Sequence, residues 1–326
     1  MSRGKGKRSQ PAIPQVRQVG NDRHPNLLLL DQFGNADLAR WQKHSEDLDQ
    51  LSRELYYSVE PERQRRHDEL IAAINTKPSF GLDLGDHCRI VDMRWMLSPL
   101  SAAGSMMSYG GRFNIGQDTE ESLHRPFPAL YLAEDYQTAF RERFQIDQVD
   151  SADGLSPADL ALVPSTLSVR LKGRLDRYLD VTDMAAIAPV AAVLKKIPIP
   201  SKALEIARRL KIGRPHKLMI RTAQKLQTEL QANWRPWPIQ YGMPGASQIF
   251  GSLAHAAGYE GIRYRSTKSK AGFCVAVFPS NIGSDETFVE LADTFPTEVE
   301  HPRLDRNSAE ALCGWSSLRA GLRPVA

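Results

Sequence analysis

The sequence predicts an α+β fold built as one main domain. Two features carry this prediction: short apolar runs of strand length at 129–133, 166–171 and 273–278, and two long stretches with helical periodicity at 36–74 and 184–230. Strands are expected on both sides of the second helical stretch. We therefore interpret that stretch as an insertion within a single domain.

Composition is that of an ordinary globular protein. The 326 residues are 41% hydrophobic and 25% charged, and a chain of this length can bury a sizeable core. The net charge of +4 is too small to indicate a nucleic-acid partner by itself. The sequence shows no apolar run that could span a bilayer and no secretory signal. Three widely spaced cysteines indicate a reducing compartment, so we expect a cytoplasmic protein without a membrane partner.

Both ends of the chain differ in pattern from the middle. Residues 1–24 are polar and basic, which favours a disordered tail, with an arm that touches a polyanion as the alternative. Residues 25–80 are expected to form an N-terminal helical extension, in which Pro61 divides the pattern into two helices. The C-terminal tail, 296–326, has little regular pattern, although Trp315 suggests that part of it docks.

The strand expected at Cys88–Trp95 carries two arginines. Arg89 and Arg94 are separated by an odd number of residues, which places them on opposite faces of a regular strand. One of them is therefore expected to face a pocket and the other to face solvent.

The central stretch, 109–144, combines a glycine turn, a strand and a helix. Its glycine pair predicts a tight turn or a close approach of the backbone to another group. The apolar run 129–133 predicts a buried strand, and Asp135 can cap the helix that follows. This order places Tyr131 near one end of the helix and Glu142 about two turns inside it.

Beyond an acidic loop at 147–159, alternation predicts a strand at 166–171 and a further strand end at 178–183. The helical stretch 184–230 contains many more Lys and Arg residues than acidic residues. We interpret its charges as a solvated helical face, with a docking surface for an acidic partner as the alternative.

The last third of the main domain is again mixed. Two Trp-Pro pairs at 234–238 predict a rigid aromatic turn. A helix begins near Ser247, and Gly258 is a natural residue to end it. Strands are then expected at 261–266 and 273–278.

The sequence lacks the familiar catalytic and metal-binding motifs. It contains no dinucleotide-binding glycine motif after a strand, no Walker A motif, no H-E-x-x-H and no G-x-S-x-G. His87 and Cys88 have no further ligands at metal spacing, so we expect no metal site. What remains is a set of polar residues at the ends of apolar strands, each of which also fits an ordinary structural role: Arg89, Tyr131, Glu142 and Ser266.

The motifs GGRFN, YLAED and A-F-R-E, in this order, resemble the signature of the RES-domain family. The resemblance covers residues 85–145 and 235–280 and implies a RES domain at 81–295, with the helical insertion at 184–230. It implies a fold similar to ADP-ribosyltransferases of the diphtheria-toxin type, in which a twisted, split antiparallel sheet with flanking helices holds NAD⁺ in a cleft.

The resemblance also implies a function. The family provides the toxin of bacterial toxin–antitoxin pairs, and its members break the bond between nicotinamide and ribose. Some members hydrolyse or phosphorolyse NAD⁺, which depletes it and arrests growth, and others ADP-ribosylate a protein target. NAD⁺ is thus expected as the substrate. The expected partner is a helix-turn-helix antitoxin encoded nearby. Any contact with nucleic acid is expected only indirectly, through this antitoxin. The sequence also leaves open that the protein forms a homo-oligomer.

Each catalytic candidate receives a role from the resemblance. Glu142 is expected to stabilise the oxocarbenium-like centre that forms on the ribose. Arg89, or Arg94 as the alternative, matches a pyrophosphate with its planar fork. Tyr131 is expected to pack on nicotinamide or ribose, and Ser266 to bind the carboxamide or to orient Glu142.

The glycine-turn residues Gly110, Gly111, Arg112 and Asn114 are expected along the NAD⁺-binding cleft, where Asn114 fastens its own turn. Three interpretations stay open from the sequence: a toxin that consumes NAD⁺, an ADP-ribosyltransferase that modifies a protein, and a binding protein whose RES domain has lost catalysis.

Overall fold

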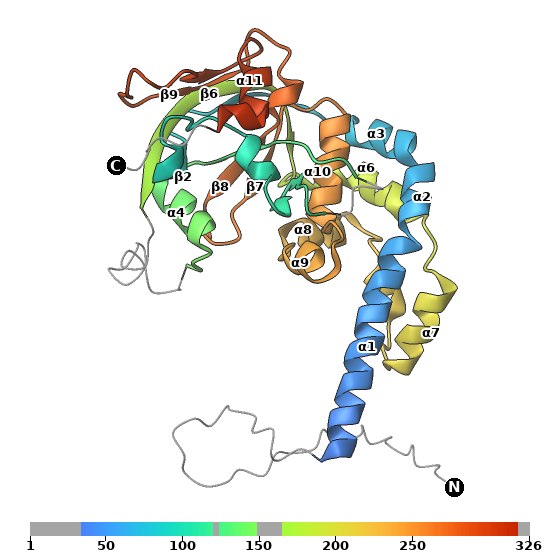
Figure 1. Ribbon diagram of the computed structural model, residues 1–326. Helices are drawn as coiled ribbons and strands as arrows, with labels where there is room; N and C mark the ends of the chain where they lie inside the picture. Colours follow the sequence, from blue (N-terminus) through green and yellow to red (C-terminus); the bar gives the residue numbers. More distant parts are fainter. Residues whose placement is uncertain (1–33, 120–123, 149–164, 319–326) are drawn as a thin grey trace, which may run out of the picture. The chain divides into compact units, whose positions relative to one another are not determined.

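The computed structural model describes residues 34–119, 124–148 and 165–318 (Figure 1). The expected basic tail, most of the acidic loop and the last eight residues lie outside these ranges. The chain divides into two compact units, 1–49 and 50–326. Helix α1 begins in the first unit and ends in the second, and everything else described below belongs to the second. Within the described ranges, no helix is both long and apolar enough to cross a membrane.

Three helices precede the sheet: α1 (Asn35–Tyr57), α2 (Glu60–Arg65) and α3 (His67–Ile74). The helical pattern is confirmed, but the expected number of two helices is wrong. Pro61 breaks the helix as predicted and then occupies the first turn of α2, where a backbone N–H has no helical partner in any case. A second break falls at Arg66, whose backbone leaves the helical region between α2 and α3.

The described residues form one main sheet of eight strands. They are β1 (Ser79–Asp83), β2 (Cys88–Asp92), β5 (Leu130–Ala133), β6 (Thr166–Asp180), β7 (Gly261–Arg265), β8 (Phe273–Val277), β9 (Phe288–Leu291) and β10 (Arg303–Leu304). Their order is β10-β9-β6-β2-β5-β8-β7, with β1 also paired to β6. A separate small hairpin is formed by β3 (Gly110–Gly111) and β4 (Asn114–Ile115).

The prediction of a fully antiparallel sheet is wrong for one pair of strands, because β6 and β7 run parallel. Parallel neighbours require a long crossover connection, and the helical stretch that begins at Met184 supplies it. Strand β6 also merges the two strands expected at 166–171 and 178–183 into one of fifteen residues. Its beginning pairs with β2 and its end with β7, so β6, β2, β5, β8 and β7 close into a ring.

The crossover contains five α-helices: α6 (Met184–Leu194), α7 (Ser201–Arg209), α8 (Ala223–Gln231), α9 (Pro236–Tyr241) and α10 (Ala246–Ala256). The rigid turn expected at the Trp-Pro pairs is instead the short helix α9, whose first turn accepts Pro236. Helix α10 ends as predicted, because Gly258 follows it with a φ of +77°. Helices α6 and α8 place buried side chains in the main core, so the stretch is integral to the packing.

Two hydrophobic cores lie on opposite faces of the sheet. Strand β8 shows the alternation, because Cys274 and Ala276 belong to one core and Val275 and Val277 to the other. Helices α3, α6, α8 and α10 provide much of the first core (Figure 1). Strands β9 and β10 and helix α11 (Ala309–Cys313) contribute to the second.

The C-terminal tail is more regular than expected, because β10 and α11 both lie beyond residue 296. Leu312 of α11 is 1% exposed and anchors this segment in the second core. The residue expected to dock, Trp315, is 47% exposed. The prediction of docking is therefore confirmed for the segment but was attached to the wrong side chain.

Candidate active site

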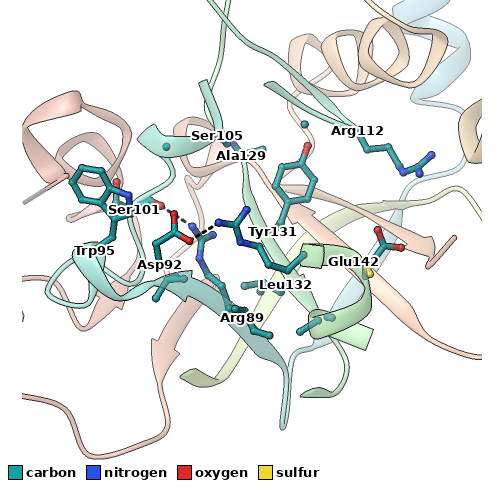
Figure 2. Close-up of a pocket in the computed structure, with 18 of the residues that line it drawn as sticks. Arg89, Asp92, Trp95, Ser101, Ser105, Arg112, Ala129, Tyr131, Leu132 and Glu142 are labelled. Atoms are coloured by element: carbon teal, nitrogen blue, oxygen red, sulfur yellow. Dashed lines mark hydrogen bonds and ion pairs between the residues drawn. The ribbon is translucent and has the colours of Figure 1, made fainter. Parts of the chain in front are cut away.

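The candidate site is a pocket of about 490 Å³ between β2, β5 and α4 (Tyr136–Phe144) (Figure 2). Strands β2 and β5 pair only through Cys88 and Ala133, and beyond that point β2 pairs with β6 alone. The two strands therefore separate, and residues from both line the pocket. Figure 2 shows Arg89 and Asp92 on one side of Tyr131, with Glu142 and Arg112 on the other.

Helix α4 presents one face to this pocket. The carboxylate of Asp135 caps the helix, as predicted, by accepting a hydrogen bond of 2.7 Å from the amide of Thr138. Ala139, Glu142 and Arg143 all line the pocket, and their spacing of three and four residues puts them on one helix face.

The carboxylate of Glu142 is fixed from behind. Its Oε1 accepts 2.6 Å from the hydroxyl of Ser266 and 2.8 Å from the amide of Thr267. The Ser266 hydroxyl in turn accepts hydrogen bonds from the amides of Lys268 and Ser269. Oε2 has no hydrogen-bond donor among the described residues, so one oxygen of Glu142 is oriented and the other is available. Ser266 does not line the pocket, and its contact with Glu142 is the hydrogen bond that orients the carboxylate.

The glycine pair forms a tight turn next to Tyr131. Gly110 has a φ of +88°, which a residue with a side chain rarely adopts. A Cβ at Gly111 would lie 2.5 Å from the Tyr131 hydroxyl oxygen. The pair therefore meets both predictions made for it, since Gly110 makes the turn and Gly111 allows the close approach.

The hydroxyl of Tyr131 is part of this turn. It accepts a hydrogen bond of 2.9 Å from the amide of Phe113 and donates one of 2.8 Å to Oδ1 of Asn114. Burial raises the pKa of Tyr131 well above its ordinary value. The hydroxyl is thus neutral and fully engaged, and the ring is the part of Tyr131 that lines the pocket.

Asn114 and Arg112 support the pocket wall. Asn114 is fully buried, and its amide nitrogen donates to the carbonyls of Ser105 and Phe127, so it fastens the turn as expected. It does not line the pocket. Arg112 does line it, but its guanidinium donates to the carbonyls of Leu230 and Ala232 at the end of α8 and to the hydroxyl of Thr267. Arg112 therefore braces the loop that holds Glu142.

Arg89 is the inner arginine of β2. One of its nitrogens donates 3.2 Å to the carbonyl of Ser101, and its buried Nε has no hydrogen-bond partner in the described part of the chain. Burial, together with the nearby charge of Arg143, lowers the pKa of Arg89 to about 10. Strand β2 ends at Asp92, three residues earlier than expected. The side chain of Arg94 is 63% exposed at the pocket rim.

The sequence did not point to several other lining residues, among them Asp92, Arg143, Trp234 and Arg235. Arg143 follows Glu142 directly, and the helix period was the available signal for it. Arg235 donates 2.8 Å to Oε1 of Gln145 at the end of α4, and its guanidinium lies over the ring of Trp234. The sequence around Trp234 and Arg235 gave no sign that this segment, far from α4 in the chain, reaches the pocket.

Two thiols also line the pocket, but neither is set up as a nucleophile. Burial raises the pKa of Cys88, and it raises the pKa of Cys274 well above the ordinary value. Both cysteines are therefore neutral at physiological pH and pack as small apolar residues. The described residues also contain no group of three metal-ligating side chains.

Comparisons with known proteins identify the family. The search of curated sequences gave no match. Among solved structures, the crystal structure of the M. tuberculosis MbcT–MbcA toxin–antitoxin complex aligns at 15% identity over 71% of this chain and 93% of that chain. Its TM-score of 0.38 is too low to support a conclusion about this protein. The profile of the RES domain matches residues 88–297, well over half of the sequence and the whole of the Glu142 helix. The chain therefore belongs to the RES domain family.

Proposed function

We propose that this protein cleaves the bond between nicotinamide and ribose in NAD⁺, by hydrolysis or phosphorolysis, as the toxin of a toxin–antitoxin pair. The observation that carries the proposal is the pairing of one oriented carboxylate, Glu142, with several guanidiniums in a single pocket. A substrate that develops positive charge at one atom and carries a diphosphate nearby matches both signs of charge. RES family membership supports the same chemistry.

The reaction follows from where the charges lie. As the glycosidic bond lengthens, its electron pair moves to the nicotinamide nitrogen, and neutral nicotinamide leaves. The ribose carbon becomes oxocarbenium-like, and the available oxygen of Glu142 stabilises it. Water, which releases a proton to solvent, or phosphate then adds to that carbon and gives ADP-ribose or its 1-phosphate. Ser266 keeps the carboxylate in place throughout, and the ring of Tyr131 forms the wall beside the sugar.

An antitoxin partner is part of the proposal. A protein that removes NAD⁺ from its own cell must be held inactive, and an inhibitor that covers the pocket would do so. The family supports a helix-turn-helix protein encoded nearby in that role. Modification of a protein target is the alternative, because ADP-ribose could be transferred to an amino-acid side chain from the same oxocarbenium-like centre.

The test is the release of nicotinamide from NAD⁺ by the purified full chain. Glu142→Gln keeps the shape of the side chain but removes its charge, so we expect release to fall by about 100- to 1000-fold. Glu205→Gln is the matched control, because Glu205 lies on α7 with a side chain that is 67% exposed and does not line the pocket. Its release should equal that of the unaltered protein.

The same assay separates the alternatives. Dependence on added phosphate distinguishes phosphorolysis from hydrolysis, and ADP-ribose bound covalently to an added protein indicates a transferase. Undiminished release by Glu142→Gln would remove Glu142 from the mechanism. A complete lack of release by the unaltered protein under all these conditions would leave a binding protein.

A further inference from the structure

We propose that Arg143, positioned by Asp92, is a second diphosphate-binding residue of this pocket, which acts together with Arg89. This inference rests on the proposed function for the identity of the substrate, but the contacts that carry it concern binding alone. It assigns a ligand role to a residue of α4 and a positioning role to a residue of β2.

Arg143 is held in the pocket by one contact. Its Nη2 donates a hydrogen bond of 2.5 Å to Oδ1 of Asp92. Arg143 makes no other side-chain hydrogen bond to a described residue. A guanidinium has five N–H donors, so most of those of Arg143 stay open. The side chain is 44% exposed in the pocket, where a ligand can reach it.

Asp92 fixes the direction of Arg143 without cancelling the positive charge of this region. Its other oxygen, Oδ2, lies 3.5 Å from the guanidinium of Arg94. One carboxylate therefore faces two guanidiniums, while Arg89 has no acidic partner in the described residues. The β2 side of the pocket thus keeps an excess of positive charge, as binding of a dianion requires.

Arg89 and Arg143 reach the same pocket from two neighbouring elements. Arg89 comes from β2 and Arg143 from α4, and the charge of Arg143 contributes to the lowered pKa of Arg89. Two guanidiniums that repel each other in the free protein are stabilised when an anion lies between them. The buried Nε of Arg89, which lacks a hydrogen-bond partner in the described structure, is a donor that such an anion would satisfy.

The order of charges along α4 matches one ligand. Glu142 and Arg143 are adjacent on the pocket face, with opposite charges. In NAD⁺, the carbon that becomes positive and the diphosphate belong to the two ends of a single ribose unit. A ligand placed with its ribose carbon at Glu142 therefore brings its diphosphate toward Arg143 and Arg89.

Binding of ADP-ribose, measured by calorimetric titration at constant ionic strength, tests this inference without requiring catalysis. Arg143→Gln should weaken ADP-ribose binding by about 10- to 100-fold, the range expected for lost hydrogen bonds to a charged group. The ADP-ribose affinity of Arg143→Lys should lie between those of the unaltered protein and Arg143→Gln, because lysine keeps the charge but lacks the planar fork. Adenosine, which lacks the diphosphate, should bind equally to all three proteins.

The matched control is Arg170→Gln. Arg170 of β6 also pairs with an aspartate, Asp293, at 2.6 Å, and lies outside the pocket. This variant should bind ADP-ribose like the unaltered protein. Equal thermal midpoints for Arg143→Gln and Arg170→Gln would show that lost binding does not reflect lost folding.

The role of Asp92 has its own signature. Asp92→Asn should weaken ADP-ribose binding by less than Arg143→Gln, Asp92→Glu should restore part of it, and adding Asp92→Asn to Arg143→Gln should cause no further loss. Additive losses would contradict a role through Arg143. Unchanged ADP-ribose binding in Arg143→Gln would overturn the whole inference, whereas a protein that binds ADP-ribose as expected but releases no nicotinamide would contradict only the proposed function.

Discussion

At the scale of single residues, the hydroxyl of Tyr131 is engaged on both sides, by the amide of Phe113 and by Oδ1 of Asn114. Tyr131→Phe keeps the ring but leaves the buried amide of Phe113 without an acceptor. We expect the free energy of unfolding to fall by about 1–3 kcal/mol. Nicotinamide release should fall far less than in Glu142→Gln, because the ring that lines the pocket remains.

Urea unfolding and the nicotinamide assay on the same variant check this prediction. Tyr136→Phe is the control, because Tyr136 is 45% exposed at the start of α4 and does not line the pocket. If Tyr131→Phe lost activity entirely and kept its full stability, the hydroxyl would have a chemical role in the reaction in place of a structural one.

At the scale of elements, helix α2 is tied down by Glu60, which is 1% exposed. Burial alone would raise the pKa of Glu60, but the contact with His124 and the hydrogen bonds from Arg63 and Gln64 outweigh burial and lower the pKa to about 2. A lowered pKa adds stability that is complete above the ordinary value of 4.5. That stability is lost as pH falls from 4.5 toward about 2.

Glu60→Gln should therefore be less stable than the unaltered protein at pH 7, by about 3 kcal/mol. The difference should shrink as the pH is lowered below 4.5, because the unaltered protein then loses the same contribution. Urea unfolding at a series of pH values measures this. Glu62→Gln, on the same helix but partly exposed, should show a small and nearly constant difference. A constant difference for Glu60→Gln would show that its charge is not the source of stability.

Elements with local signals were predictable from the sequence, and those defined by distant contacts were not. The glycine turn and the capped α4 were foreseen because Gly110 and Asp135 act on their own neighbours in sequence. Strand β6 was divided in two because Gly173 interrupts its apolar alternation. In the structure, a Cβ at Gly173 would lie 2.1 Å from the backbone oxygen of Phe288 in β9. The glycine therefore allows the close approach of a strand that is distant in sequence.

The candidate site shows the same division. Glu142 and Tyr131 carry recognisable motifs, but the contact between Glu142 and Ser266 spans 124 residues and follows from the fold. Asp92 and Arg143 were missed because their ion pair joins β2 to α4. The sequence does not show whether a charged side chain of a helix faces solvent or forms an ion pair with another element.

At the scale of the whole molecule, the basic crossover is now partly accounted for. Lys196 pairs with Glu69 of α3, Lys202 with Glu54 of α1, and Arg209 with Glu205 within α7. These contacts satisfy part of the excess charge within the molecule, which favours the solvated face over a docking surface. Exposed pairs of this kind contribute about 0–1 kcal/mol each, so they add little stability.

We therefore expect that reversal of Lys195, Lys196, Arg208 and Arg209 to Glu changes neither nicotinamide release nor binding of the proposed antitoxin. None of the four residues lines the pocket. The control reverses four other exposed cations, which changes the net charge equally: Arg170, Lys172, Arg303 and Arg306. Binding is measured at low salt and at 0.1 M salt, where exposed charges are screened over about 10 Å. Weaker binding by the crossover variant than by its control at low salt, with the difference removed by added salt, would establish the crossover as a docking surface.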